Sequence, residues 1–296
     1  MSKNILLAPY TTFKIGGRTK YFCEARNSED IITAITMAKK EDLPFFILGN
    51  GSNILIGDAG FDGLIIRMLN TKYQIPRSRQ AKRGGLNTKI IAEAGTNLGE
   101  LVNESVKSGL MGLEWTAGIP GSIGGAVRGN AGALGSSMAD LIKTVEVFDI
   151  TNLKIQTFKN KDCKFGYRDS VFKHDKNLII LSVELELKKG NREKSEKLIK
   201  EYLKQRKQKQ PLEYPSAGCI FKNPKDFSAG YLIEQCGLKG KKIGKAMISE
   251  QHANFIINLG NARAKDVKKL IDLCKEKVRE KFGVKLEEEI EYLGEF

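Results

Sequence analysis

The chain has 296 residues, of which 41% are hydrophobic, and this is enough to bury a sizeable core in two or more domains. The formal net charge of +14 is compatible with nucleic-acid binding, but an acidic small substrate explains a positive field equally well. No stretch approaches the roughly 20 apolar residues of a membrane span, and the N-terminus lacks a signal-peptide core, so we expect a cytoplasmic protein without membrane contact.

Several kinds of site are excluded by motifs that the sequence lacks. The five cysteines form no CxxC pair and there are only two histidines, so we expect neither a disulfide framework nor a metal site. The dinucleotide pattern GxGxxG and the phosphate-loop pattern GxxxxGK[ST] are both missing, which argues against a Rossmann or P-loop fold. The nucleophile pattern GxSxG is missing as well.

The first expected elements are a helix and two strands joined by a glycine-rich turn. Ser28 can cap a helix that runs to about Lys40, because apolar residues recur there at helical spacing. Pro44 ends this unit, and two apolar runs within residues 45–56 flank the turn. A buried strand, a tight turn and a second strand are the simple interpretation, and an ordinary hairpin turn is the alternative. The turn consists of Gly49, Asn50, Gly51, Ser52 and Asn53.

The next segments are strands, a basic loop and a helix. Residues 64–68 and 89–93 have the composition of strands. Between them we expect an exposed loop, and its basic stretch 77–83 lacks the aromatic side chains that stack on bases. Residues 97–108 should form a helix that ends at Gly109.

The stretch from residue 109 to residue 135 contains nine glycines. Each glycine inside a regular strand or helix would cost backbone entropy, so here the main chain must approach something closely or adopt positive φ. Backbone N–H groups at turns and helix starts are what phosphate oxygens bind. Together with the turn at 49–53, this stretch favours a large phosphate-bearing ligand.

Three β-like runs follow at 144–150, 154–158 and 178–187. Between the second and the third lies the aperiodic segment FGYRDSVFK, residues 165–173, in which an arginine stands beside two aromatic residues. The pattern leaves two interpretations open, a binding site or a surface turn.

The C-terminal third begins with a charged helix over residues 188–209, whose glutamates and lysines favour a solvated helix face. Pro211 and Pro215 then mark a domain boundary. Further elements are predicted as a short helix at 230–237, a strand-like run at 255–259 and an amphipathic helix at 264–282.

The tail at residues 286–294 is a possible strand with three glutamates on one side, Glu287, Glu289 and Glu291. Glutamates in such a pattern are normally solvated.

Eight segments resemble the UDP-N-acetylenolpyruvoylglucosamine reductases, the MurB family, in their order and spacing over nearly the whole chain. They are TFKIGG (12–17), LGNGSN (48–53), AGIPGSIGGAV (117–127), NAGA (130–133), FGYRDSVFK (165–173), AGCIFKNP (217–224), EQHANFIIN (250–258) and LEEEIEYLG (286–294). The resemblance implies an α+β protein, with an FAD-binding fold of the vanillyl-alcohol-oxidase (PCMH) type and a separate C-terminal α+β substrate domain.

The resemblance also sets expected domain limits. We expect two FAD-binding subdomains at residues 1–68 and 69–189, and a substrate-binding domain at 190–296. The span 173–211 leaves little room for the inserted loop of longer family members, so the chain resembles the shorter subtype.

The activity implied by the resemblance is the reduction of UDP-N-acetylglucosamine enolpyruvate to UDP-N-acetylmuramate by a flavoprotein oxidoreductase, a step of peptidoglycan precursor synthesis. The implied cofactor is FAD and the reductant is NADPH. Hydride passes from the reduced flavin N5 to C3 of the enolpyruvyl ether, the charge on C2 and its carboxylate must be stabilised, and C2 must be protonated. The alternatives are an FAD oxidase of the same superfamily and a basic nucleic-acid-binding protein.

Three catalytic residues follow from the resemblance. Arg168 is expected to bind the substrate carboxylate, since its planar guanidinium can pair with both oxygens. Glu289 is expected to polarise the same carboxyl group from a buried position with a raised pKa. Where the family usually has a serine, this chain has Cys219, whose thiol is mostly protonated at neutral pH and is our hypothesis for the C2 proton donor. Donation by Ser216 or by a water is the alternative.

The remaining expected contacts are with the two ligands. Tyr167, Lys222 and Asn223 are candidates for binding the UDP-sugar, and His252 is expected to be structural. Backbone N–H groups of the two glycine segments should hold the pyrophosphate and ribityl parts of FAD. These cofactor-binding candidates are Gly49, Asn50, Gly51, Ser52, Asn53, Gly118, Ile119, Pro120, Gly121, Ser122, Gly124 and Gly125.

Overall fold

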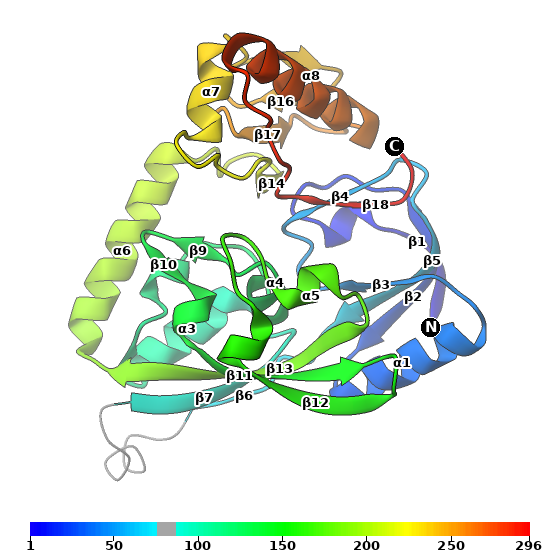
Figure 1. Cartoon of the computed structure of the whole chain (residues 1–296), viewed down its shortest axis with the longest axis vertical. Coiled ribbons are helices and arrows are strands. Elements are labelled where there is room, and N and C mark those ends of the chain that lie inside the picture. The colour runs from blue at the N-terminus through cyan, green and yellow to red at the C-terminus, as the bar shows by residue number, and fades with distance from the viewer. Residues whose placement is uncertain (76–86) are drawn as a thin grey trace.

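The computed structural model describes residues 1–75 and 87–296, arranged in three groups of elements around the centre of the molecule (Figure 1). The basic stretch 77–83 lies outside the described residues. Within those two ranges, no helix combines the length and the apolar composition that crossing a bilayer requires.

The first group is a four-stranded sheet covered by one helix. Its strand order is β1-β2-β5-β3, in which β1 is antiparallel to β2 and the other neighbours are parallel. Helix α1 has the predicted bounds, Ser28–Lys40, but its cap is Asn27, whose side chain accepts a hydrogen bond from the Asp30 N–H group at 2.8 Å. The strands are β1 (Ser2–Leu6), β2 (Arg18–Ala25), β3 (Phe45–Leu48) and β5 (Phe61–Met68), and a 3₁₀ helix spans Ala8–Tyr10.

The two strands that flank the first glycine turn belong to different sheets. Strand β3 pairs with β5, whereas β4 (Ile54–Ile56) pairs in parallel with β18 (Glu291–Leu293) at the C-terminal end of the fold. The hairpin alternative is therefore wrong. The predicted tail strand is also shorter than expected, because β18 covers only three residues of the range 286–294.

The second group is built on a larger sheet with the order β12-β11-β13-β7-β6. Strands are found where they were predicted, with ends shifted by up to two residues. Helix α3 (Leu98–Lys107) confirms the predicted helix and is capped by the side chain of Asn97. The strands are β6 (Tyr73–Gln74), β7 (Asn87–Glu93), β11 (Ile142–Asp149), β12 (Lys154–Lys159) and β13 (Leu178–Lys189).

Short elements complete the second group. The glycine-rich stretch forms helix α4, preceded and followed by irregular backbone and two-residue strands. These elements are β8 (Leu110–Met111), α4 (Ile123–Arg128), β9 (Gly132–Ala133), β10 (Ser136–Ser137), α5 (Val171–His174) and 3₁₀ helices at Glu114–Thr116, Met138–Asp140 and Asn160–Cys163.

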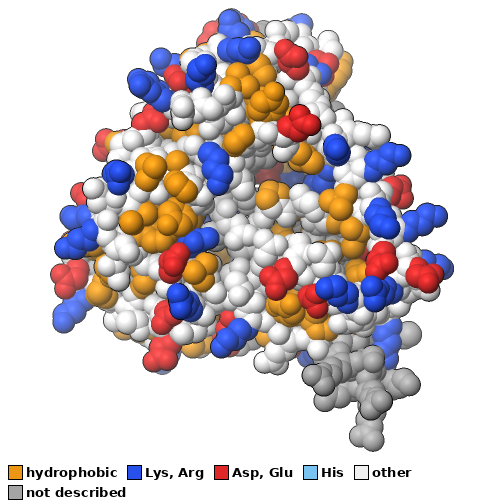
Figure 2. All heavy atoms as spheres, turned by 180° about the vertical axis from the view of Figure 1, so that it is seen from behind, with side chains coloured by type: hydrophobic (Ala, Val, Ile, Leu, Met, Phe, Trp, Pro, Cys, Tyr) orange, Lys and Arg blue, Asp and Glu red, His pale blue; other side chains and the backbone are white. Residues whose placement is uncertain are grey.

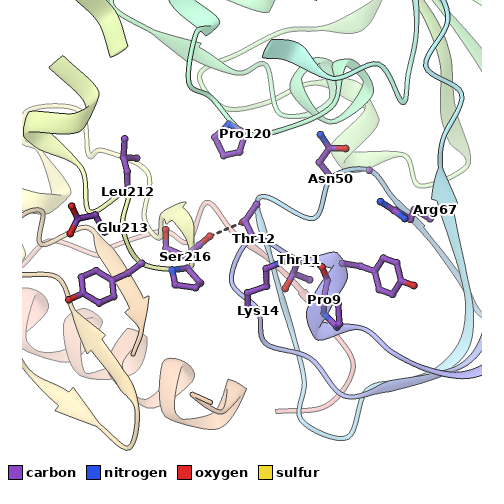
Figure 3. A pocket seen from close by; sticks show the side chains of 14 residues that line it. Pro9, Thr11, Thr12, Lys14, Asn50, Arg67, Pro120, Leu212, Glu213 and Ser216 are labelled. Carbon is purple, nitrogen blue, oxygen red and sulfur yellow. Dashed lines mark hydrogen bonds between the residues drawn. The ribbon is translucent and has the colours of Figure 1, made fainter. Parts of the chain in front are cut away.

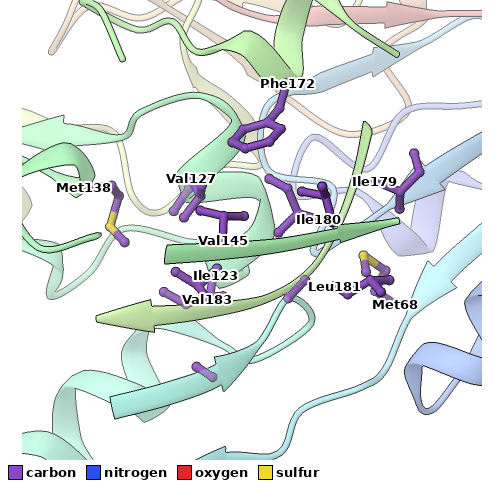
Figure 4. Close-up of a cluster of buried hydrophobic side chains, with 14 of the residues drawn as sticks. Met68, Ile123, Val127, Met138, Val145, Phe172, Ile179, Ile180, Leu181 and Val183 are labelled. Atoms are coloured by element: carbon purple, nitrogen blue, oxygen red, sulfur yellow. The ribbon is translucent and has the colours of Figure 1, made fainter. Parts of the chain in front are cut away.

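One hydrophobic cluster joins the first two groups. It runs from Ile31 and Ile35 of α1 into the large sheet and reaches α4 on the other side. Figure 4 shows Ile123 and Val127 of α4 near Val145 and Val183 of the sheet. The glycine-rich stretch is therefore anchored to a rigid core.

The third group contains the C-terminal sheet, order β14-β17-β16-β15, and two helices. Helix α8 has the predicted bounds, Ala264–Phe282, and α7 (Ala229–Gln235) lies within one or two residues of its prediction. The strands are β14 (Ser216–Cys219), β15 (Lys242–Ile243), β16 (Ala246–Ile248) and β17 (Phe255–Asn258). Helix α6 (Arg192–Lys209) connects this group to the second.

Residues from the first group help to form the core of the third. Phe13, Ile15 and Leu55 are buried in the same cluster as the apolar face of α8. Asp58 accepts hydrogen bonds from the first two backbone N–H groups of α8, at 2.8 and 3.2 Å, and so caps a helix that begins 206 residues later. The C-terminal group is thus fastened to the N-terminal one by both apolar and polar contacts.

Candidate active site

The three predicted catalytic residues come together. Arg168 Nε lies 3.2 Å from Glu289 Oε1, and both side chains are mostly buried, with 24% and 16% of their surface exposed. Burial raises the pKa of the Cys219 thiol to about 12; Glu289 also raises it, while the Arg168 and Arg206 guanidinium groups lower it. All four groups therefore lie within electrostatic reach of one another.

Glu289 is set between two distant segments. Its backbone N–H donates to the Ile220 carbonyl at 2.7 Å, next to Cys219, and its own carbonyl accepts from Asn53 Nδ2 at 3.0 Å. Burial raises the pKa of its carboxyl group, and the cations of Arg168, Lys173 and Lys222 lower it. The net shift is upward, the direction that a carboxyl group sharing a proton with the substrate requires.

Arg168 lies in a tight turn held from both sides. Its φ of +54° is a left-handed conformation that non-glycine residues rarely adopt, and such strain is often found at functional sites. Asn130 Nδ2 donates to the Gly166 carbonyl at 2.7 Å, and Ser170 Oγ donates to the Arg128 carbonyl at 2.6 Å. The segment is therefore a turn, as one interpretation predicted, but its arginine side chain points inward.

The glutamates of the tail are paired with cations. Glu287 pairs with Lys222, Glu289 with Arg168 and Glu291 with Arg128. The expectation of solvation fits only the first, whose side chain is 70% exposed, and is wrong for the other two. The alternating sequence pattern predicted that the three glutamates share one face of the tail. It did not predict which cations would lie opposite them.

Arg206 is a site residue that the sequence analysis missed. It lies on α6, which was expected to present a solvated face and is mostly exposed elsewhere. Its Nη2 donates to the Trp115 carbonyl at 3.2 Å, and its stem packs close to Gly118. The spacing in the sequence could have indicated this position. Arg206 follows Tyr202 by four residues, which places both on the helix face that packs against the core.

Lys173 is a second missed residue, at the end of the FGYRDSVFK segment. Its Nζ donates to the Arg168 carbonyl at 3.1 Å. Burial lowers its pKa, and the neighbouring cations of Lys222 and Arg128 lower it further, while Glu289 raises it. The site therefore gathers at least five positively charged side chains, three of which act on the Glu289 carboxyl group, and this suits an anionic ligand. They are Arg128, Arg168, Lys173, Arg206 and Lys222.

The two glycine segments lie against each other. A Cβ atom on Gly49 would come within 2.5 Å of Ser122 Oγ, and one on Gly121 within 3.3 Å of Ser52 Oγ. Gly51 has a φ of +61°, and a Cβ there would lie 2.3 Å from the Tyr10 carbonyl. Gly124 packs directly on Ala94, so the need for a glycine at that position is explained by helix–sheet packing alone.

An open cavity of about 570 Å³ adjoins these segments (Figure 3). Gly49, Asn50 and Pro120 line one part of it. Ser216 lies on another part, with its carbonyl accepting from Thr12 Oγ1 at 2.7 Å. The remaining lining residues are Pro9, Tyr10, Thr11, Lys14, Arg67, Leu212, Glu213, Tyr214 and Pro215.

The chain's own residues fit an anionic dinucleotide cofactor and an anionic substrate. Backbone without side-chain bulk borders the cavity at Gly49. Over the described residues, Nε of Arg206 is buried without a hydrogen-bond partner, whereas Nε of Arg168 makes no hydrogen bond but lies 3.2 Å from Glu289 Oε1 in an ion pair. A buried donor normally finds a partner, so Nε of Arg206 is suited to bind an acceptor on a ligand.

The candidate substrate-binding residues also lie together. The Asn223 N–H donates to Tyr167 Oη at 3.3 Å, and Asn223 Oδ1 accepts from the Ala229 N–H at 3.0 Å. Lys222 adjoins them in sequence and is within reach of Glu289. His252 packs its ring against Phe255 and accepts a hydrogen bond from the Asn254 N–H, which is consistent with its expected structural role.

Comparison with known proteins agrees with this architecture. A family model described as an FAD binding domain matches residues 19–157, and a model of the C-terminal domain of UDP-N-acetylenolpyruvoylglucosamine reductase matches residues 210–293. The chain has the fold of an FAD-binding oxidoreductase with an added C-terminal domain.

The full-length relatives narrow this class to one family. Two proteins named UDP-N-acetylenolpyruvoylglucosamine reductase are each 43% identical to the chain. The match to the protein from Caldanaerobacter subterraneus subsp. tengcongensis covers 97% of this chain and 91% of that protein. The match to the protein from Caldicellulosiruptor bescii covers 98% of this chain and 90% of that protein. The crystal structure of the enzyme of that name (MurB) from Thermus caldophilus superposes with a TM-score of 0.81 at 38% identity, covering 99% of this chain and 98% of that one. This chain belongs to the UDP-N-acetylenolpyruvoylglucosamine reductase family.

Proposed function

We propose that this protein uses FAD and NADPH to reduce the enolpyruvyl ether of UDP-N-acetylglucosamine enolpyruvate, giving UDP-N-acetylmuramate. The proposal depends most on one observation: Arg168, Glu289 and Cys219, which come from three distant segments, meet next to Asn53 of the first glycine turn. Each of the three supplies something that the reaction needs.

The first need is to stabilise negative charge. When bound, FAD supplies the hydride that adds to C3 of the substrate, and charge then develops on C2 and its carboxylate. Arg168 binds that carboxylate through its planar guanidinium, whose Nε lies 3.2 Å from Glu289 Oε1 and so brings the two groups to the same carboxylate. Glu289, held with a raised pKa, shares a proton with the same carboxylate and so favours the enolate-like transition state.

The second need is a proton for C2. The Cys219 thiol is protonated throughout the neutral range, because burial raises its pKa to about 12. As the electron pair at C2 takes the proton, the S–H bond breaks and a C–H bond forms. The guanidinium groups of Arg168 and Arg206 stabilise the resulting thiolate, which then regains a proton from solvent.

The rest of the substrate is assigned to the face formed by Tyr167, Lys222 and Asn223. Lys222 provides a cation for the diphosphate, and the tyrosine and asparagine provide hydrogen-bonding groups that are already linked to each other. Because Lys222 also lies near Glu289, this face is continuous with the catalytic group.

The alternatives receive less support. On the coloured part of the face shown in Figure 2, Lys and Arg side chains are interspersed with Asp and Glu and do not form the single-sign stripe that is typical of nucleic-acid binding. An FAD oxidase takes a hydride and a proton from its substrate and so needs a general base, whereas the raised pKa keeps the Cys219 thiol protonated.

The direct test is anaerobic. The purified protein is expected to be yellow, to be bleached by NADPH, and to recover its visible spectrum when UDP-N-acetylglucosamine enolpyruvate is added, with UDP-N-acetylmuramate detected by mass spectrometry. Rapid recovery with oxygen alone, and none with the enolpyruvyl substrate, would identify an oxidase. A colourless protein with salt-sensitive DNA binding would identify a nucleic-acid-binding protein.

A further inference from the structure

Asn53 is the last residue of the first glycine turn, yet its polar groups are bonded to the C-terminal tail. Its side-chain Nδ2 donates to the Glu289 carbonyl at 3.0 Å, and its backbone carbonyl accepts from the Glu291 N–H at 3.0 Å. One residue therefore holds the main chain at Glu289 and two positions beyond it, although 236 residues separate it from Glu289 in sequence.

The contact is well placed to fix the carboxyl group of Glu289. Strand β18 begins only at Glu291, where it meets Ile54 of β4, so Glu289 lies between this strand and the isolated bridge that joins Glu288 to Phe221. Its backbone is held there by two hydrogen bonds, one to Ile220 and one from the Asn53 side chain. Loss of the second leaves the residue held on one side alone.

Asn53 also stands next to the segment that borders the cavity. Ser52 approaches Gly121, and Gly49 and Asn50 line the cavity itself. The first residues of the turn, Gly49 and Asn50, therefore face the cavity, whereas its last residue, Asn53, contacts the C-terminal tail.

We propose that Asn53 is a positioning residue that holds Glu289 opposite Arg168. This inference depends on the proposed function. It differs from the sequence-based expectation, in which Asn53 was one of the groups that bind FAD. A small displacement of a catalytic group can cost about 10²-fold in rate, so the effect should fall on the substrate half of the reaction.

The test compares Asn53→Ala with Asn50→Ala, a matched change in the same turn. Asn50 lines the cavity, so Asn50→Ala is expected to raise the Kd for FAD. Asn53→Ala is expected to leave the Kd for FAD and the rate of flavin reduction by NADPH within about threefold of those of the unaltered protein, while substrate-driven flavin reoxidation slows roughly 10- to 100-fold. Both rates are measured anaerobically in single turnovers at saturating FAD. Asn53→Gln, which keeps the amide, should recover part of the loss.

Two further measurements separate positioning from a general structural defect. In the double variant with Glu289→Gln, Asn53→Ala should add less than threefold, because the group that it positions is already absent. Amide hydrogen exchange of residues 286–294, measured without NADPH or substrate, should be faster in Asn53→Ala and unchanged in Asn50→Ala.

The outcomes are distinct. The inference is overturned if Asn53→Ala reoxidises at the normal rate, if it loses FAD as Asn50→Ala does and slows both half-reactions equally, or if the two losses multiply in the double variant. Failure of the unaltered protein to be reoxidised by the enolpyruvyl substrate would instead overturn the proposed function. The exchange measurement would still report whether Asn53 holds the tail.

Discussion

The two sides of the candidate site carry different chemistry. The second group supplies cations from Arg128 at the end of α4, Arg168 in a turn and Lys173 in α5. The C-terminal group supplies two acids, Cys219 and Glu289, and burial raises both of their pKa values. These cations and these two acids thus come from different parts of the chain, so substitutions on the two sides should have different kinetic signatures.

The largest effect is expected on the cationic side. Arg168→Ala removes the guanidinium that binds the developing carboxylate and leaves Glu289 without its partner, so reoxidation by substrate should slow about 10³-fold and the KM for substrate should rise. Flavin reduction by NADPH should change little. Stopped-flow absorbance measures both steps, with Arg192→Ala, an exposed arginine on α6, as the control. Equal slowing of the two steps would contradict the division of roles.

On the acidic side, Cys219→Ala should slow reoxidation by about 10²-fold or more, because a general acid is lost. The KM should change much less than in Arg168→Ala. Cys219→Ser should retain a larger share of the rate, since a hydroxyl can occupy the same position. Single-turnover reoxidation with UDP-N-acetylglucosamine enolpyruvate is the measurement. Normal turnover by Cys219→Ala would assign proton donation to Ser216 or to a water.

The pH dependence should identify Glu289. Its folded pKa is raised, chiefly by burial, above its ordinary value of 4.5, so the protonated form persists to higher pH than in the unfolded chain. Reoxidation should be fast below that raised pKa and fall by up to tenfold per pH unit above it, and Glu289→Gln should lose this dependence.

The stability of the fold should report the same shift. Between pH 4.5 and the raised pKa the folded protein binds more protons than the unfolded chain, so its free energy of unfolding falls as pH rises. Glu289→Gln should lack this fall, which urea unfolding at a series of pH values would detect. A parallel pH dependence in protein and variant would contradict the raised pKa.

A substitution of Arg206 would test whether a cation from α6 assists proton donation by Cys219. Arg206→Met keeps the stem that packs against Gly118 and removes the charge near Cys219, so reoxidation should slow roughly three- to tenfold, about one pKa unit at most. Lys204→Met, at an exposed position on the same helix, is the control. An effect of equal size in both variants would point to net charge rather than to the local guanidinium.

The smallest expected effect is on stability, at the contact between Asp58 and the N-terminus of α8. Asp58→Ala removes the cap of α8 and should lower the free energy of unfolding by about 1 kcal/mol. Asp62→Ala, where the side chain is 88% exposed, should have an effect below about 0.5 kcal/mol. Urea unfolding compares them, and equal values would show that the cap contributes nothing.

Hydrophobic periodicity predicted the helices well, because an amphipathic helix buries whatever apolar face it has. The bounds of α1 and α8 were correct for this reason. Partners of strands were not predictable, since the apolar runs around the first glycine turn are the same whether β3 and β4 pair with each other or not. For the same reason the tail gave no sign that Glu291 would meet Arg128.

The catalytic group was proposed from family resemblance rather than from a pattern. Arg168, Cys219 and Glu289 are far apart in sequence and meet only in the folded chain, so spacing alone could not join them. Arg206 and Lys173 are not predictable from the sequence, because charged side chains in such segments are normally solvated. The side chain of Asn53 is a similar case, in which membership of a glycine turn concealed a bond to a distant segment.

The shared core of the third group limits how this chain can be recombined with its relatives. Phe13, Ile15 and Leu55 fill space beneath α8, and β4 is the only strand that pairs with β18 among the described residues. A chimera that exchanged residues 210–296 alone would bring a foreign helix face onto these three side chains. A chimera should therefore exchange three segments together, namely residues 11–15, residues 53–58 and the C-terminal group.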